Sequence, residues 1–258
     1  MSNGPAYLMV GRGRWAMRMR KILAGENRSI VEIEQTRQKN EEQEADYRMR
    51  LEAWMRRSKA QVAWLCVPPG SHVGLMAKAA IGAGLHVVVE KPWFGSRAET
   101  VELQELADHA GKRIGVHYEY CLLEEVEAWS ARFSTEAGLS FSGKFHHRQS
   151  DHLHLDALDN FGTHLVSIRN FAVPGATMGA LDCAYDRPDQ RTVCLERRGS
   201  CIASLDLLTC QEPIVQRFIA KFEAAMEGQT FFLDLTFAMH VAEEISAFRR
   251  LSAVSGRG

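Results

Sequence analysis

The sequence predicts an α/β protein in which a doubly wound parallel sheet is followed by a smaller α+β domain with an open antiparallel sheet. In the first half, short apolar, β-branched segments alternate with helical segments, as is typical of parallel strands buried on both faces. In the second half, strand-like segments alternate between apolar and polar residues, as is typical of antiparallel strands with one solvated face. We therefore expect a boundary near residue 120 and domains at 1–120 and 121–258.

Each element of the first half has a local signal. Strands end where Gly, Pro or charged residues follow, and helices carry Leu, Met or Ala at helical spacing. Ser71 is expected to cap the third helix, and Ser96 with Glu99 is a capping box for the fourth. The expected strands are 7–10, 30–34, 62–67, 86–89 and 114–118. The first expected helix ends near residue 24, the second spans 40–57, and the third and fourth begin after Ser71 and Ser96.

The second half begins with strand signals and closes with two helices. Cys201, Ala203, Leu205 and Leu207 alternate with more polar residues, which indicates a half-buried strand. The expected strands are 139–147, 179–185, 191–196 and 201–209, and the expected helices are 214–226 and about 233–251.

The composition favours a protein that binds a small molecule. With 258 residues, 46% of them hydrophobic, the chain can form two modest cores. Lys and Arg number 31 against 32 Asp and Glu, so the net charge of −1 predicts neither nucleic-acid nor anionic-membrane binding. No apolar run of about 18 residues and no signal-peptide pattern occurs, so a soluble, cytoplasmic protein is expected.

A glycine motif between the first strand and the first helix predicts dinucleotide binding. Gly11 permits a tight turn, Gly13 lets the backbone approach a pyrophosphate, and Ala16 allows close helix packing. The phosphates would lie at the helix N-terminus, whose N–H groups and dipole favour anions. The alternative is a glycine-rich turn that binds no ligand.

The choice between NAD and NADP depends on the residues that follow the second strand. Glu34 would suit the ribose hydroxyls of NAD, whereas Thr36 and Arg37 would suit the 2′-phosphate of NADP. Arg12 and Arg14 add positive charge beside the glycine motif. We therefore favour NADP(H).

The segment Glu90-Lys91-Pro92 follows the fourth strand directly. Ligands of such sheets bind beyond the C-terminal ends of the strands. Pro92 restricts the backbone of Lys91, so this lysine is expected to leave the strand in a defined direction. Lys91 is therefore a candidate acid or hydrogen-bond donor, and the alternative is an ordinary solvated lysine.

With these motifs in order, the chain resembles the Gfo/Idh/MocA family of oxidoreductases. The resemblance rests on Gly11–Ala16, Val67-Pro68-Pro69 with His72, 83–87, Glu90-Lys91-Pro92, Asn160–His164 and 218–248. It implies a Rossmann domain, a second domain that often mediates oligomerisation, a nicotinamide near Lys91, and a substrate facing His164. The residues it assigns to the cofactor are Gly11, Arg12, Gly13, Arg14, Trp15, Ala16, Thr36, Arg37, Val67, Pro68, Pro69, His72, Glu90, Lys91 and Pro92.

The chain departs from the family pattern at two places. The family commonly has an aspartate four residues before the histidine, where this chain has Asn160. After the fifth strand the family often has an asparagine and an arginine, where this chain has His117 and Glu119. The proton relay and the substrate edge are therefore expected to be unusual.

Hydride transfer to or from a C–O or C–N carbon also requires the movement of a proton. Lys91 and His164 are the predicted catalytic residues, one as acid or base and the other as hydrogen-bond donor. His164 could instead be a buried structural histidine. The predicted substrate contacts are His117, Tyr118, Arg148, Asn160 and His164.

The sequence therefore predicts an NAD(P)-dependent oxidoreductase acting on a small polar metabolite such as a sugar, a cyclitol or an imine. Histidines 146, 147, 152, 154 and 164 match no compact zinc pattern, so no metal is expected. A homo-oligomer, dimer or tetramer, is expected from the resemblance. The alternatives are a nucleotide-binding sensor without turnover and a reductase of a conjugated cyclic acceptor.

Overall fold

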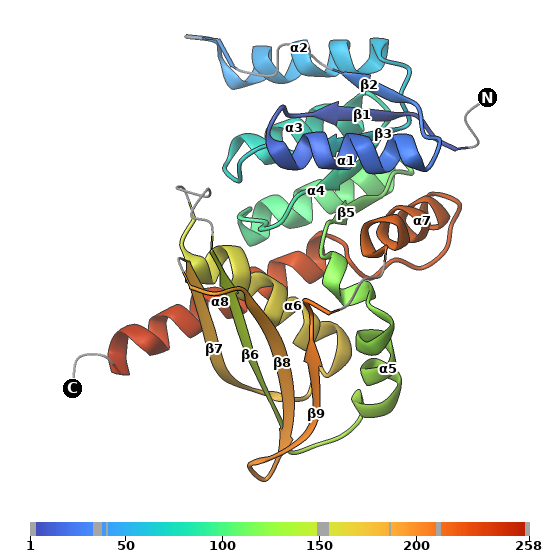
Figure 1. The fold of residues 1–258 in the computed structure, drawn as a ribbon. Coiled ribbons are helices and arrows are strands. Elements are labelled where there is room, and N and C mark those ends of the chain that lie inside the picture. The colour runs from blue at the N-terminus through green and yellow to red at the C-terminus, as the bar shows by residue number, and fades with distance from the viewer. Residues whose placement is uncertain are drawn as a thin grey trace. The chain divides into compact units, whose positions relative to one another are not determined.

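The chain forms two compact units, shown in Figure 1. The computed structural model describes residues 4–32, 38–39, 41–148, 155–185, 187–209 and 213–255. One unit comprises Met1–His117 and Val215–Met239, and the other comprises Tyr118–Ile214 and His240–Gly258. This division differs from the predicted domains 1–120 and 121–258, because residues 215–239 pack with the first unit.

The first unit is built on a parallel five-stranded sheet of order β2-β1-β3-β4-β5. All residues of β1 and β3 are buried, as expected for strands covered on both faces. The strands are β1 Tyr7–Val10, β2 Ile30–Glu32, β3 Val62–Leu65, β4 His86–Val89 and β5 Ile114–Val116. The helices between them are α1 Arg14–Gly25, α2 Glu44–Arg57, α3 His72–Gly82 and α4 Arg97–His109.

The two predicted helix caps have different outcomes. The Ser96 hydroxyl accepts a hydrogen bond from the Glu99 backbone N–H at 3.2 Å, which confirms this cap of α4. The prediction that Ser71 caps α3 is wrong, since its side chain makes no capping hydrogen bond and its backbone is already helical, with φ −56° and ψ −29°. A capping side chain requires an extended residue, so the geometry of Ser71 prevents the bond.

Helix α7, Ile214–Met226, belongs to the first unit although it lies late in the sequence. It buries Val215, Phe218, Ile219 and Phe222, spaced as on one helical face. The Phe218 ring lies 6.0 Å from the Trp64 ring of β3. Beyond α7, the Leu233 carbonyl accepts a hydrogen bond of 2.7 Å from the Val116 N–H of β5. The edge strand β5 therefore gains a backbone partner.

The second unit contains a four-stranded mixed sheet of order β7-β6-β8-β9. The pairs β6–β8 and β8–β9 are antiparallel, but β6 and β7 are parallel, so the prediction of a wholly antiparallel sheet is wrong. The chain between β6 and β7 passes through a helix, and such a crossover permits parallel pairing. The strands are β6 Leu139–His147, β7 Thr177–Tyr185, β8 Gln190–Arg197 and β9 Ser200–Asp206.

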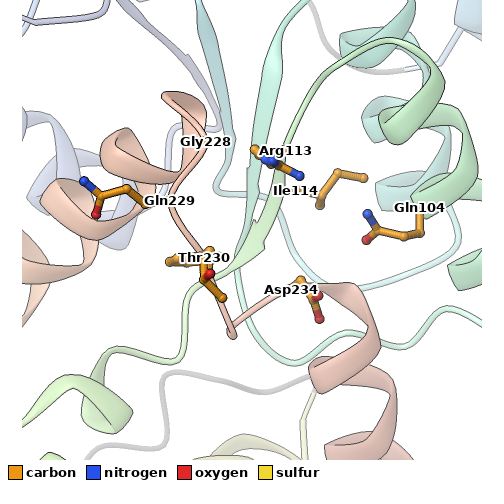
Figure 2. Close-up of a pocket in the computed structure, with 8 residues that line it drawn as sticks. Gln104, Arg113, Ile114, Gly228, Gln229, Thr230 and Asp234 are labelled. Atoms are coloured by element: carbon orange, nitrogen blue, oxygen red, sulfur yellow. The ribbon is translucent and has the colours of Figure 1, made fainter.

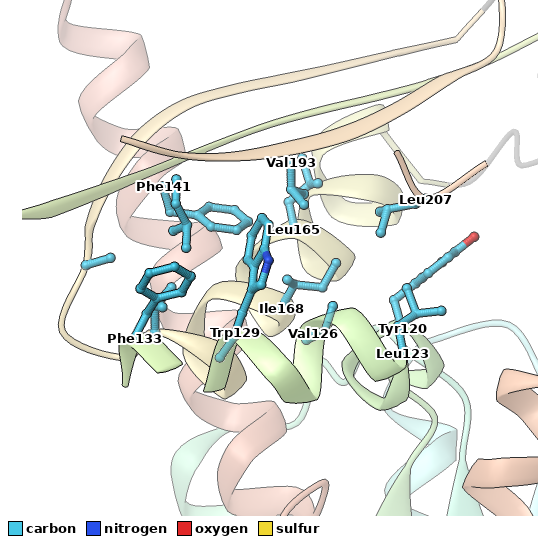
Figure 3. Packing of buried hydrophobic residues seen from close by; sticks show 14 of the residues in the cluster. Tyr120, Leu123, Val126, Trp129, Phe133, Phe141, Leu165, Ile168, Val193 and Leu207 are labelled. Atoms are coloured by element: carbon cyan, nitrogen blue, oxygen red, sulfur yellow. The ribbon is translucent and has the colours of Figure 1, made fainter. Parts of the chain in front are cut away.

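The core of the second unit lies between this sheet and two helices, α5 Glu124–Phe133 and α6 Thr163–Ala172. Figure 3 shows Val126, Trp129 and Phe133 of α5 directed toward Phe141 and Val193 of the sheet. A 3-10 turn η1, Glu119–Leu122, precedes α5, and a π-helical turn η2, Leu158–Gly162, leads into α6. Of the predicted site residues, Asn160 lies in η2.

Helix α8, Leu235–Ser255, closes the described chain. Its first turn is capped by Asp234, whose carboxylate accepts a 2.9 Å hydrogen bond from the Phe237 N–H. Among the described residues, no helix combines the length and the apolar character needed to cross a membrane.

Candidate nucleotide and catalytic site

The glycine loop after β1 has the backbone geometry that close approach requires. Gly11 has φ +127°, and a Cβ there would lie 2.1 Å from the carbonyl oxygen of Cys66. Only glycine fits this position, because an L side chain would meet both strain and a backbone clash. A Cβ at Gly13 would meet no atom within 4 Å, so the space over this residue is open.

Helix α1 begins directly after this loop, and its first turn suits an anion. Gly13 is the residue before the helix and supplies no side chain to satisfy the first N–H groups. No acidic residue lies in the first turn of α1. Ala16 is 1% exposed and packs closely. The N–H groups and dipole at a helix N-terminus favour a pyrophosphate, so these residues fit a dinucleotide.

Arg20 connects the loop to the end of β2. Its Nη2 donates to the Gly11 carbonyl at 2.8 Å, and its Nε lies 3.0 Å from an Oε1 of Glu32. Glu32 is the last residue of β2 and 64% of its side chain is exposed. Glu34, Thr36 and Arg37, which were predicted to recognise the ribose or its phosphate, lie outside the described residues.

The predicted cofactor segments of the first unit lie at one edge of the sheet. Gly11–Ala16 follow β1, Val67-Pro68-Pro69 follow β3, and Glu90-Lys91-Pro92 follow β4; His72 begins α3. The strand order changes direction between β1 and β3, so this edge includes the switch point at which such sheets bind ligands. Lys91 is half-buried, and its peptide bond to Pro92 is cis.

Glu90 is held by side chains from the neighbouring strands. Its Oε1 accepts a hydrogen bond of 2.8 Å from the Trp64 indole and lies 3.2 Å from Nδ1 of His117. Burial alone would raise the pKa of Glu90, but the charge and hydrogen bond of His117, with the indoles of Trp64 and Trp15, hold this pKa below its ordinary value. The carboxylate is therefore ionised although its side chain is only 12% exposed.

The remaining predicted substrate and catalytic residues lie in the second unit, except His117, which is fully buried in the first. His164, in the first turn of α6, is 5% exposed; its ring lies 4.8 Å edge-on from that of Tyr120 and 5.5 Å stacked from that of Phe145. Tyr118 is buried, whereas Arg148 is exposed and donates its backbone N–H to Asp189 at 2.9 Å.

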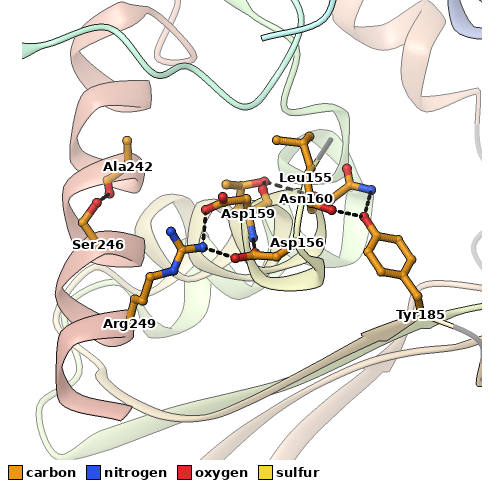
Figure 4. A network of polar contacts seen from close by, with 9 residues as sticks. Leu155, Asp156, Asp159, Asn160, Tyr185, Ala242, Ser246 and Arg249 are labelled. Carbon is orange, nitrogen blue, oxygen red and sulfur yellow. Dashed lines mark hydrogen bonds and ion pairs between the residues drawn. The ribbon is translucent and has the colours of Figure 1, made fainter. Parts of the chain in front are cut away.

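Asn160 takes part in the polar network of Figure 4, around the π-helical turn η2. Its Nδ2 donates to the Tyr185 hydroxyl at 3.1 Å, and this hydroxyl donates to the Leu155 carbonyl at 3.2 Å. Arg249 of α8 bonds to Asp159 at 2.8 Å and also to Asp156. Burial and the charge of Asp156 raise the pKa of Asp159, against the opposing effect of Arg249. The asparagine is a donor here, which an ionised aspartate would not be.

A pocket of about 290 Å³ lies elsewhere in the first unit (Figure 2). Its lining residues are Gln104, Arg113, Ile114, Gly228, Gln229, Thr230, Phe231 and Asp234. Ile114 is the first residue of β5, so this pocket is at the opposite end of that strand from His117. None of the predicted site residues is among its described lining. Among the residues that the structure describes, no three or more His, Cys, Asp or Glu side chains form a group that could hold a metal ion.

The first unit is similar in sequence to known oxidoreductases. Residues 6–118 match the sequence profile described as an oxidoreductase family with an NAD-binding Rossmann fold, Gfo/Idh/MocA. A 63-residue segment is 41% identical to the uncharacterized oxidoreductase YfiI of Bacillus subtilis, covering 24% of this chain and 16% of that protein.

Solved structures share the fold over nearly the whole chain. The UDP-N-acetylglucosamine 3-dehydrogenase GnnA of Acidithiobacillus ferrooxidans is similar with a TM-score of 0.76 and 12% identity, over 95% of this chain and 96% of that one. The WlbA dehydrogenase of Thermus thermophilus, solved with NAD and UDP-GlcNAcA, is similar with a TM-score of 0.71 and 14% identity, over 95% of this chain and 94% of that one. The similarity of fold to these structures thus extends through both units.

Proposed function

We propose that the protein is an NAD(P)-dependent dehydrogenase or reductase that transfers a hydride between a nicotinamide and a C–O or C–N carbon of a small polar metabolite. The observation that carries this proposal is the glycine loop, with Gly11 at φ +127° and open space at Gly13, on the same sheet edge as Glu90-Lys91-Pro92. Among sugars, cyclitols and imines, a sugar is the substrate class favoured by the activity named for GnnA.

Each part of the site has a proposed role. The loop N–H groups and the N-terminus of α1 bind the pyrophosphate, and the bound nicotinamide supplies or accepts the hydride. Lys91 and His164 are the proposed catalytic residues: one moves a proton to or from the substrate heteroatom, and the other donates a hydrogen bond to that atom. Tyr118, Arg148 and Asn160 are the proposed substrate contacts from the second unit.

We infer a preference for NADP(H) from the charges beside the loop. Arg12 and Arg14 are exposed, and Arg37 follows the second strand in the sequence. Glu32 would favour the ribose hydroxyls of NAD, but its ion pair with Arg20 offsets its charge. NADPH is therefore expected to bind more tightly than NADH. Tighter binding of NADH would contradict this preference while leaving the reaction class intact.

A nucleotide titration followed by a substrate screen tests the proposal. The wild-type protein should bind NADPH or NADH and change nicotinamide absorbance with at least one sugar, cyclitol or imine. Lys91→Ala should lower kcat by roughly a hundredfold or more, as expected for loss of an acid or base, while Lys21→Ala on the exposed side of α1 should have little effect. Absence of nucleotide binding would refute the proposal, and binding without turnover would favour a sensor.

A further inference from the structure

A buried polar cluster joins the C-terminal ends of β3, β4 and β5. Its centre is the Glu90 carboxylate, which accepts from the Trp64 indole at 2.8 Å and lies 3.2 and 3.4 Å, through its two oxygens, from Nδ1 of His117. The Cys66 thiol donates to the same carboxylate at 3.7 Å. The cluster thus gathers side chains from three strand ends around the residue that precedes Lys91.

Aromatic packing limits the movement of His117. The side chain is fully buried, and its ring lies 4.6 Å from that of Phe218 and 5.2 Å from that of Trp64, both edge-on. The Trp15 ring, in the first turn of α1, lies 6.0 Å from the His117 ring. The imidazole is therefore confined in an orientation that directs Nδ1 toward Glu90.

Backbone hydrogen bonds restrain the same residues. The His117 N–H donates to the Val89 carbonyl at 2.9 Å, and the Glu90 N–H donates to the Leu65 carbonyl at 3.3 Å. Glu90 is thus held at both its backbone and its carboxylate, immediately before Lys91. A side chain that emerges from such a restrained segment has fewer accessible positions.

We propose that His117 is a positioning residue for Lys91 and acts through its buried contact with Glu90. This inference rests on the proposed role of Lys91 in the reaction. His117 replaces the asparagine that is frequent in the family, and here it contributes both a hydrogen bond and a positive charge to the buried carboxylate. The other titratable groups that face the pair are the Cys66 thiol, whose pKa is raised well above its usual range by burial, and Arg20, which acts on that thiol.

The first test is spectroscopic and needs no turnover. In protein with isotope-labelled tryptophan, the Trp64 indole N–H signal, assigned with Trp64→Phe, reports protonation of Glu90. Without the His117 charge, burial raises the pKa of Glu90, so in His117→Asn the acid transition should move up by at least about one pH unit. His86→Asn, the same substitution at the other end of β4, is the control. An unchanged transition in His117→Asn would overturn the proposal.

The second test measures the position of Lys91 directly. After isotope-labelled reductive methylation of the lysines, the Lys91 signal, assigned with Lys91→Ala, should shift in both His117→Asn and Glu90→Gln but not in His86→Asn. If it is unchanged in both variants, the pair does not position Lys91. This outcome is distinct from failure of the proposed function, which is seen as absence of nucleotide binding or turnover in the wild type.

The third test separates a positioning role from a merely structural one. In the active enzyme, His117→Asn and Glu90→Gln should each lower kcat about tenfold, and His117→Asn should change the Kd for the nucleotide less than about twofold. The kcat of the double variant should be no lower than that of the less active single variant, because both changes break the same contact. Losses that multiply, or a change confined to the melting temperature, would overturn the proposal.

Discussion

Two titratable side chains at opposite ends of β4 respond to burial in different ways. Glu90 has a protonatable neighbour in His117 and stays ionised. His86 is half-buried near positive charges, so its partial burial first, and then Lys112 and Arg113, lower its pKa from 6.5 to about 4. Its Nδ1 also accepts a 3.0 Å hydrogen bond from the Arg113 N–H, which requires a neutral ring nitrogen.

The lowered pKa of His86 predicts a loss of stability in mild acid. Between about pH 6.5 and 4 the unfolded chain binds a proton at His86 that the folded chain does not, so the free energy of unfolding falls as the pH falls through this window. His86→Asn should make this fall shallower, as measured by urea unfolding at several pH values. The exposed His109→Asn is the control, and equal slopes for wild type and His86→Asn would contradict the prediction.

Single-residue signals predicted one part of the candidate site better than the rest. Gly11 and Lys91 could be proposed because local patterns, a turn that needs glycine and a strand followed by Pro92, mark them in the sequence. The partners of Glu90 were not predicted, because Trp64 and His117 come from other strands and meet it only through the sheet register. His117 was instead expected to contact substrate, and its burial in the first unit was not foreseen.

At the scale of elements, α7 depends on specific contacts with the first sheet. Glu223 of α7 bonds to Arg28 through both carboxylate oxygens, at 2.7 and 2.6 Å, and to the Tyr7 hydroxyl at 2.9 Å. Burial, with the charge of Glu223, raises the pKa of Tyr7, and the hydrogen bond to Glu223 raises that of Arg28. These three side chains are mutually satisfied, so removal of Glu223 leaves two polar groups without their partner.

We expect Glu223→Ala to lower the free energy of unfolding by about 3 kcal/mol, since it leaves the poorly exposed charge of Arg28 uncompensated. Chemical denaturation of the variant would show this as a lower midpoint. Glu227→Ala, at the exposed end of the same helix, is the matched control and should change stability by less than about 0.5 kcal/mol. Equal effects of the two substitutions would show that the Glu223 contacts contribute little.

Periodicity predicted α7 but did not predict α5 or α6. Helix α7 was predicted with its observed bounds because its apolar residues lie on one face. Helix α6 was not predicted, since residues 163–168 are all buried and the segment has no polar face to set a period. The parallel pairing of β6 and β7 was missed because an alternating pattern defines a strand but not its partner.

At the scale of the whole molecule, the first unit is assembled from two distant segments of the chain. Residues 1–117 contain the five strands and the glycine loop, but α7 and the segment that pairs with β5 come from 215–239. Without them, Phe218 and Phe222 no longer cover the sheet, and Glu223 no longer pairs with Arg28. We therefore expect the domain predicted from the sequence, 1–120, to be an incomplete folding unit.

This leads to a prediction about fragments. Residues 1–120 alone should lack a cooperative thermal transition and should not bind NADPH, although they contain the complete glycine motif, because exposed apolar surface and an unpaired Arg28 would destabilise the sheet. Residues 1–117 joined by a long Gly/Ser linker to 214–239 should regain both properties, measured by circular dichroism and nucleotide titration. A Phe218→Ser, Phe222→Ser version of the joined fragment is the control and should behave like 1–120. Cooperative folding and NADPH binding by 1–120 alone would show instead that the parallel sheet and its four helices suffice.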